Sequence, residues 1–208
     1  MKEYYQARAP EYDEWYLGLG KFAARQRPGW HEAVRELQEA VASLPPAGTL
    51  DVACGTGFLT RHLAGPVTGL DQSEGMLAIA RERVPDGRFV QGDATTTLPF
   101  EDGAFERVFT GHFYGHLEPG AREAFVAEAR RVAPELVVVD SAWGGPSRVW
   151  GSHAREEWQE RVLNDGSSFK VFKRYFEADD LVAELGGGTV LHTSDWFVMV
   201  ASRGLLRP

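Results

Sequence analysis

Short apolar runs alternate with helical stretches from residue 49 onward. The apolar runs, which we interpret as strands, are residues 49–54, 67–71, 88–93, 105–112 and 135–143. The helical stretches between them are residues 56–65, 73–84 and 119–133. Ser73 stands at a helix N-cap and Pro119 in a first helical turn, where each is favoured. This order predicts a parallel sheet covered by helices, which is a doubly wound α/β fold.

The two ends of the chain depart from this alternation. Apolar residues at 30, 34, 37 and 41 have helical spacing, and that helix ends before Pro45. Residues 177–188 form another predicted helix. The two strand-like runs within 189–203 have too little chain between them for a crossover, so we expect an antiparallel pair. No repeat or linker divides the chain, and we expect one domain spanning 1–208.

Composition narrows the function classes. The 208 residues carry a formal net charge of −8, which disfavours nucleic acid as a partner. Cys54 is the only cysteine, so neither an intramolecular disulfide nor a cysteine-rich metal site is expected. No apolar run approaches the roughly 20 residues that cross a bilayer. We therefore expect a cytoplasmic protein with no metal centre and no membrane partner.

The segment DVACGTGFLT at 51–60 carries two glycines in the first strand-to-helix turn. At that turn of a doubly wound sheet a ligand approaches the backbone closely. A dinucleotide site needs a third glycine, but Thr60 stands at its position after Gly55 and Gly57. Asp51 precedes the small Ala53 and can accept a hydrogen bond from an ammonium group. The ligand is therefore not expected to be a dinucleotide; the alternative is a tight turn that needs positive φ.

Two further acids stand where the next two strands end. Asp71, at the second strand, can receive both hydroxyls of a ribose. Asp93, followed by Ala94, can accept from the exocyclic amine of adenine. Each acid alone could be a helix cap or a turn residue. Three successive strand ends favour a ligand site at the carboxyl edge of the sheet.

These segments, LDVACGTG, GLDQSEGMLAIA and GDATTTLPFEDGAFERVFT, resemble the successive motifs of class I S-adenosylmethionine (SAM)-dependent methyltransferases. The resemblance implies SAM as cofactor and a Rossmann-like sheet of seven strands, in the order 3-2-1-4-5-7-6 with strand 7 antiparallel. It implies that Asp51 and the 53–57 loop hold the methionine part, and that Asp71 holds the ribose. The residues implied in cofactor binding are Tyr12, Asp51, Ala53, Cys54, Gly55, Gly57, Asp71, Gln72, Met76, Asp93 and Ala94.

The N-terminal segment 4–22 resembles the lid of small-molecule methyltransferases of the quinone-biosynthesis and sugar-amine types. Its aromatic residues Tyr4, Tyr12, Trp15 and Tyr16 could close over the sulfonium; the alternative is that they anchor a helix to the core. The expected divisions are a helical lid at 1–46, a cofactor-binding core at 47–143, a substrate-side insertion at 144–177, and a last helix with the antiparallel pair at 178–208.

The loop TGHFYGHLEPG at 110–120 follows the fourth strand and faces the expected methyl group. His112 and His116 are candidate bases there, although either could simply pack or cap. An acceptor that is already nucleophilic needs only alignment. The loop lacks the Asn- or Asp-Pro-Pro-aromatic stretch of enzymes that methylate exocyclic amines, so we expect a small-molecule acceptor. A nicotinamide-dependent oxidoreductase and a non-catalytic SAM-binding module are the alternatives, and a monomer and a homodimer remain equally open.

Overall fold

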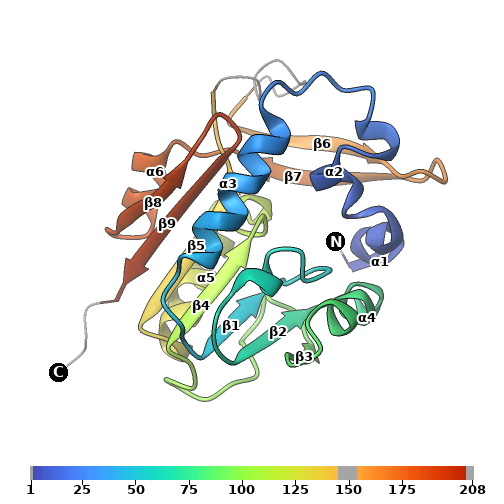
Figure 1. The fold of residues 1–208 in the computed structure, drawn as a ribbon. Coiled ribbons are helices and arrows are strands. Elements are labelled where there is room, and N and C mark those ends of the chain that lie inside the picture. Colours follow the sequence, from blue (N-terminus) through green and yellow to red (C-terminus); the bar gives the residue numbers. More distant parts are fainter. Residues whose placement is uncertain (1, 145–153, 205–208) are drawn as a thin grey trace.

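The computed structural model describes residues 2–144 and 154–204, and its centre is a seven-stranded sheet of order β3-β2-β1-β4-β5-β9-β8 (Figure 1). The strands are β1 (Thr49–Val52), β2 (Val67–Asp71), β3 (Arg88–Gln91), β4 (Arg107–Gly111), β5 (Glu135–Ser141), β8 (Thr189–Thr193) and β9 (Phe197–Arg203). The first five are parallel, whereas β9 runs antiparallel to β5 and β8. The predicted fold and strand order are confirmed, with β8 and β9 as the sixth and seventh sheet strands.

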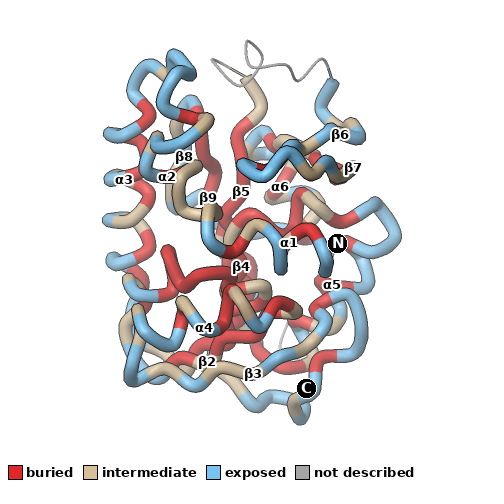
Figure 2. Tube along the Cα trace, turned by 90° about the vertical axis from the view of Figure 1, so that its right-hand side faces the viewer, coloured by how far each residue is buried: buried red, intermediate tan, exposed pale blue. Residues whose placement is uncertain are grey.

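The central strands are buried because helices cover both faces of the sheet (Figure 2). On one face, α5 (Pro119–Val132) and α6 (Ala178–Glu184) pack into one apolar cluster. On the other, α3 (Trp30–Ala42) contributes to a second cluster. The apolar residues of α3 at 30, 34, 37 and 41 are all buried, as their spacing predicts.

Of the two helices predicted to follow the first two strands, one forms and the other does not. Helix α4 (Glu74–Arg83) begins as predicted, because the Ser73 hydroxyl accepts from the Met76 N–H at 3.2 Å. The predicted helix at 56–65 is wrong: only the 3-10 turn η3 (Thr60–His62) forms. Gly57 with φ of +73° breaks the helical path at its start, and Leu63 is already extended at its end. The chain between them makes only this one 3-10 turn before it becomes extended.

Two layers extend beyond the sheet at its carboxyl edge. The N-terminal segment forms α1 (Lys2–Arg8), η1 (Ala9–Glu11), α2 (Glu14–Leu17) and η2 (Gly20–Phe22). The insertion forms a hairpin of β6 (Glu156–Val162) and β7 (Ser168–Arg174), which pairs separately from the main sheet. Helix α1 lies between α4 and this hairpin (Figure 2). Residues 145–153 of the insertion lie outside the described part of the chain.

None of the helices within residues 2–144 and 154–204 combines the length and the apolar character needed to cross a membrane.

Candidate active site

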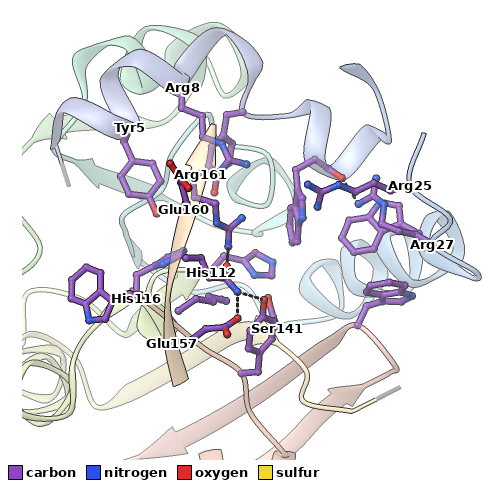
Figure 3. A pocket seen from close by; sticks show the side chains of 18 residues that line it. Tyr5, Arg8, Arg25, Arg27, His112, His116, Ser141, Glu157, Glu160 and Arg161 are labelled. Atoms are coloured by element: carbon purple, nitrogen blue, oxygen red, sulfur yellow. Dashed lines mark hydrogen bonds between the residues drawn. The ribbon is translucent and has the colours of Figure 1, made fainter. Parts of the chain in front are cut away.

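Three cavities meet at the carboxyl edge of the sheet. The edge cavity, about 200 Å³, lies over the ends of β1, β2 and β4 and is lined by Asp71, Asp93 and Gly111 among others. The inner cavity, about 10 Å³, lies beside Asp51 and Phe58. The outer cavity, about 410 Å³, lies between the N-terminal segment and the hairpin (Figure 3). Tyr12 lines all three, and His112 lines both the edge and the outer cavities.

The structure brings most of the predicted cofactor residues together. Those that line the edge cavity are Tyr12, Ala53, Gly55, Asp71, Gln72, Met76, Asp93 and Ala94. Asp51 and Cys54 line the inner cavity instead. Ala53 has a φ of +58°, a conformation that non-glycine residues adopt mainly where the surroundings impose it. The loop after β1 therefore carries strain at the point where the edge and inner cavities join.

Asp51 has an unsatisfied oxygen. Its Oδ2 accepts from the Thr60 hydroxyl at 2.6 Å, whereas Oδ1 is buried and has no partner in the described residues. Burial raises the Asp51 pKa to about 7, with a further increase from the charge of Asp71, although the Thr60 hydrogen bond opposes this. A buried acceptor facing a small cavity is suited to a ligand donor such as an ammonium group.

Asp71 organises the glycine loop while facing the edge cavity. Its Oδ2 accepts from the Gly55 N–H at 3.0 Å, and its Oδ1 from the Ser73 N–H at 2.8 Å. Burial raises its pKa, although these backbone donors favour the charged form. Each carboxylate oxygen has a second lone pair, so the group can still accept from ligand hydroxyls. Gly55 leaves room for the approach, since an added Cβ would lie 3.6 Å from Tyr12 Cε1.

The second glycine of the loop serves the backbone conformation. Gly57 has a φ of +73°, which favours glycine, whereas an added Cβ would make only an ordinary contact with Ala80, at 3.4 Å. Gly57 does not line any of the three cavities.

Asp93 has a partly local role, because its Oδ1 accepts from both the N–H and the hydroxyl of Thr95, at 2.8 and 2.7 Å. Its other oxygen is available to the edge cavity.

The two candidate histidines occupy different environments. His112 has a φ of +58°, and neither ring nitrogen has a hydrogen-bond partner in the described residues. Burial lowers its pKa to about 4, despite Asp140 Oδ1 at 3.9 Å from its Nδ1. His116 Nδ1 donates to the Phe172 carbonyl at 2.6 Å, which leaves its Nε2 as an acceptor. Burial lowers the His116 pKa to about 3. Both rings are therefore neutral at pH 7.

The N-terminal aromatic residues divide between the cavities. Trp15 lines the outer cavity, and Tyr16 stacks on Phe58 beside the inner one, with ring centroids 4.0 Å apart. Tyr4 was expected at the site and lies elsewhere, buried against the hairpin with its ring 5.4 Å from that of Phe169. Tyr5 lines the edge and outer cavities instead. Adjacent residues of a helix point about 100° apart, and the apolar pattern alone did not show which tyrosine faces inward.

Polar contacts hold the N-terminal segment over the glycine loop. Asp13 accepts from the Thr56 hydroxyl at 2.6 Å and from Arg83 of α4 at 2.5 Å. Gln6 accepts from the Ser73 hydroxyl at 3.0 Å, next to the start of α4. These contacts place Tyr5 and Tyr12 above the strand ends.

The hairpin supplies the opposite wall of the outer cavity with charged residues that sequence reasoning missed. Residues 157–161 of β6 line the cavity, as does Lys173 of β7. Figure 3 labels Glu157, Glu160 and Arg161 among them. Lys173 is buried and donates to Asp140 at the end of β5, at 2.5 Å. The sequence signal for these two strands was a weak alternation of residue types in EEWQERV and SFKVFKR. Charged residues occupy several of the inward-facing positions that are apolar in most strands.

A seven-stranded sheet of this order, with acids at successive strand ends, defines a Rossmann-like ligand-binding protein. The methyltransferase domain profile matches residues 49–135. The demethylmenaquinone methyltransferase of Beutenbergia cavernae is 30% identical over 173 residues, which are 78% of this chain and 70% of that protein. The dTDP-3-amino-3,6-dideoxy-alpha-D-glucopyranose N,N-dimethyltransferase of Streptomyces fradiae is 40% identical over 142 residues, or 65% of this chain and 52% of that protein.

Solved structures agree over nearly the full length. The DhpI–SAH complex superimposes with a TM-score of 0.73 at 28% identity, covering 99% of this chain and 95% of that one. The DhpI–SAM–HEP complex superimposes with a TM-score of 0.72 at 27% identity, covering 97% of this chain and 95% of that one. The chain belongs to the SAM-dependent methyltransferases, whose cofactor is SAM. It spans 52% and 58% of the length of two curated sugar-amine methyltransferases that it matches.

Proposed function

We propose that this protein transfers the methyl group of SAM to a small molecule bound in the outer cavity. The observation that carries the proposal is the junction of the edge and outer cavities at Tyr12 and His112. The activities that the relatives are named for, N,N-dimethylation of a dTDP-amino sugar and methylation of demethylmenaquinone, support a small-molecule acceptor. The net charge of −8 supports action on a free small molecule rather than on nucleic acid.

The proposed cofactor contacts follow the acids of the strand ends. The unpartnered Asp51 oxygen would accept from the amino group of the methionine part, and Asp71 from the ribose hydroxyls. Asp93, Ala94, Gln72 and Met76 would surround the adenine side of the edge cavity. Cys54 and Ala53 would lie behind the methionine part. Tyr12 would close the site from the N-terminal segment.

When bound, SAM would supply a methyl group activated by its sulfonium for transfer to an acceptor lone pair, with the sulfur as the leaving group that keeps the electron pair. The protein aligns the acceptor, and alignment supplies much of the lowering of the barrier. His112 borders both cavities and is neutral at pH 7, so it can take a proton from an acceptor hydroxyl or amine. His116 lines only the outer cavity and would orient the acceptor.

A ligand titration tests the proposal directly. Purified protein is expected to bind SAM and SAH in calorimetry and not to bind NAD, because the glycine loop lacks the dinucleotide spacing. Incubation with methyl-labelled SAM and a small-molecule extract should move label into a low-mass product. Equal heats for NAD and SAM would contradict the proposal, and binding of SAM without any labelled product would favour a non-catalytic SAM-binding module.

The affinity for SAM is expected to rise with pH through about 7, because Asp51 has a pKa of about 7 and only its charged form pairs with an ammonium group. Below that pH the neutral carboxyl group must first lose its proton, so binding weakens as pH falls. Calorimetry between about pH 5.5 and 8.5 measures the trend. Asp51→Asn is the control and should bind weakly with no such slope; a flat wild-type profile would contradict the assignment.

His112→Gln is expected to lower kcat by about 10²-fold with little change in the Kd of SAM, because it removes only the proton acceptor. The wild-type kcat should stay constant above about pH 4 and fall below it, where His112 becomes protonated. His116→Gln is the matched control with a smaller expected effect. Single-turnover rates within a few-fold of wild type for His112→Gln would rule out the base and leave alignment as the mechanism.

A further inference from the structure

The outer cavity gathers positive side chains in a chain whose net charge is −8. Its lining includes four arginines and one lysine, from three separate segments. They are Arg8, Arg25, Arg27, Arg161 and Lys173. The carboxylates that line the same cavity are Glu157 and Glu160. Positive charge is thus concentrated in the cavity assigned to the acceptor (Figure 3).

Two of the five cations are occupied by the protein itself. Lys173 pairs with the buried Asp140 at 2.5 Å. Arg27 donates to the Trp15 carbonyl at 2.8 Å, and its guanidinium lies over the Trp30 ring, 3.9 Å from the centroid. These contacts fix both side chains as parts of the cavity wall.

The remaining three, which we call the arginine set, are Arg8, Arg25 and Arg161. None of them forms an ion pair with a carboxylate in the described residues. Arg8 donates to the Tyr4 hydroxyl, and Arg25 lies over the Phe22 ring at 4.8 Å. Arg161 donates one N–H to the Gln159 side chain, while its Nε is buried with no partner.

Both carboxylates of the cavity accept hydrogen bonds from neutral side chains. Glu160 accepts from the Ser168 hydroxyl at 2.6 Å, and Glu157 accepts from the Gln159 amide at 2.6 Å. Burial lowers the pKa of Arg25, and the charges of Arg161 and Arg8 lower it further. Like charges held together at a partly buried site repel one another unless an anion enters. The five cations outnumber the two carboxylates of the cavity, so the lining keeps an excess of positive charge.

We propose that the methyl acceptor is a small organic oxyanion, bearing a phosphate or carboxylate group that the arginine set binds. Guanidinium groups match such oxyanions because their N–H donors form two parallel hydrogen bonds to them. The anion lies in the outer cavity, on the acceptor side of His112 and Tyr12, and so holds the acceptor beside the cofactor. This inference rests on the proposed function, since it names the substrate class of that site.

Anion binding by the SAH-loaded protein tests the inference. Inorganic phosphate and succinate are titrated separately, with glycerol as the neutral probe. At least one anion is expected to bind, and Arg25→Gln and Arg161→Gln should each lower its affinity at least tenfold through loss of charged hydrogen bonds. Arg25→Lys and Arg161→Lys should restore only part of the affinity. Whether phosphate or succinate binds more tightly identifies the oxyanion.

The matched control is Arg35→Gln on the exposed face of α3, where the arginine pairs with Glu32 and Glu39. It removes the same charge from the chain and should leave anion affinity unchanged. Absence of anion binding by the wild type, or equal affinity in the double variant Arg25→Gln/Arg161→Gln, would overturn the inference. Failure of the wild type to bind SAH would contradict the proposed function instead, because phosphate titrated without SAH still reports on the arginine set.

Discussion

Replacing Asp140 by alanine is expected to lower the free energy of unfolding by about 3–5 kcal/mol, the usual cost of breaking a buried ion pair. The change leaves Lys173 buried without a counter-charge and removes the acceptor of the Gly115 and Ser141 N–H groups, both at 2.7 Å. Urea unfolding measures the loss. The double variant Asp140→Ala/Lys173→Met should recover part of it, and equal losses in both would show that the pair is not the cause.

The ion pair of Asp140 and Lys173 also makes the free energy of unfolding depend on pH. Burial alone would raise the Asp140 pKa, but the charge of Lys173, helped by His112, holds it below its usual value. A depressed pKa in the folded state means that the stabilisation is complete above the unfolded value of about 3.9 and is lost as pH falls through the folded value. Acid unfolding of the wild type should therefore show a stability decrease below pH 4 that Asp140→Ala lacks.

Replacing Asp71 by alanine is expected to weaken SAM binding at least tenfold. Each lost hydrogen bond from a ribose hydroxyl to the charged carboxylate is worth about 1.5–3 kcal/mol, and the Gly55 and Ser73 N–H groups lose their acceptor as well. Calorimetry measures the affinity, and circular dichroism checks the fold. Asp86→Ala, at an exposed turn before β3, is the control. Unchanged affinity in a folded Asp71→Ala protein would remove Asp71 from the site.

The parts of the fold that the sequence predicts are those where one physical cause dominates. Ser73 is an N-cap because its hydroxyl has a backbone donor within reach, and α3 follows the spacing of Trp30, Val34, Leu37 and Val41. The apolar strands were predicted equally well, because no other sequence pattern overlaps them. The strand order came from the family resemblance, since alternation alone leaves several parallel arrangements open.

The acceptor side was not predictable in the same way. The arginine set comes from α1, the stretch after η2 and β6, and only the tertiary fold brings these segments together. The hairpin has charged residues facing its cavity, so its alternation lacks the apolar face that identifies most strands. Gly57 and Tyr4 show a related limit of sequence-based prediction. The glycine loop and the N-terminal helical segment were predicted, but the sequence did not show that Gly57 lies away from the cavities or that Tyr4 packs against the hairpin.

The position of Tyr12 has a thermodynamic consequence. Its ring forms part of the wall of all three cavities, so any rotation of it changes the space available to both ligands at once. A ligand that binds more tightly to one orientation of the ring shifts the population that the other ligand meets. Linkage then makes the effect reciprocal: the factor by which the first ligand changes the affinity of the second equals the factor in the opposite direction.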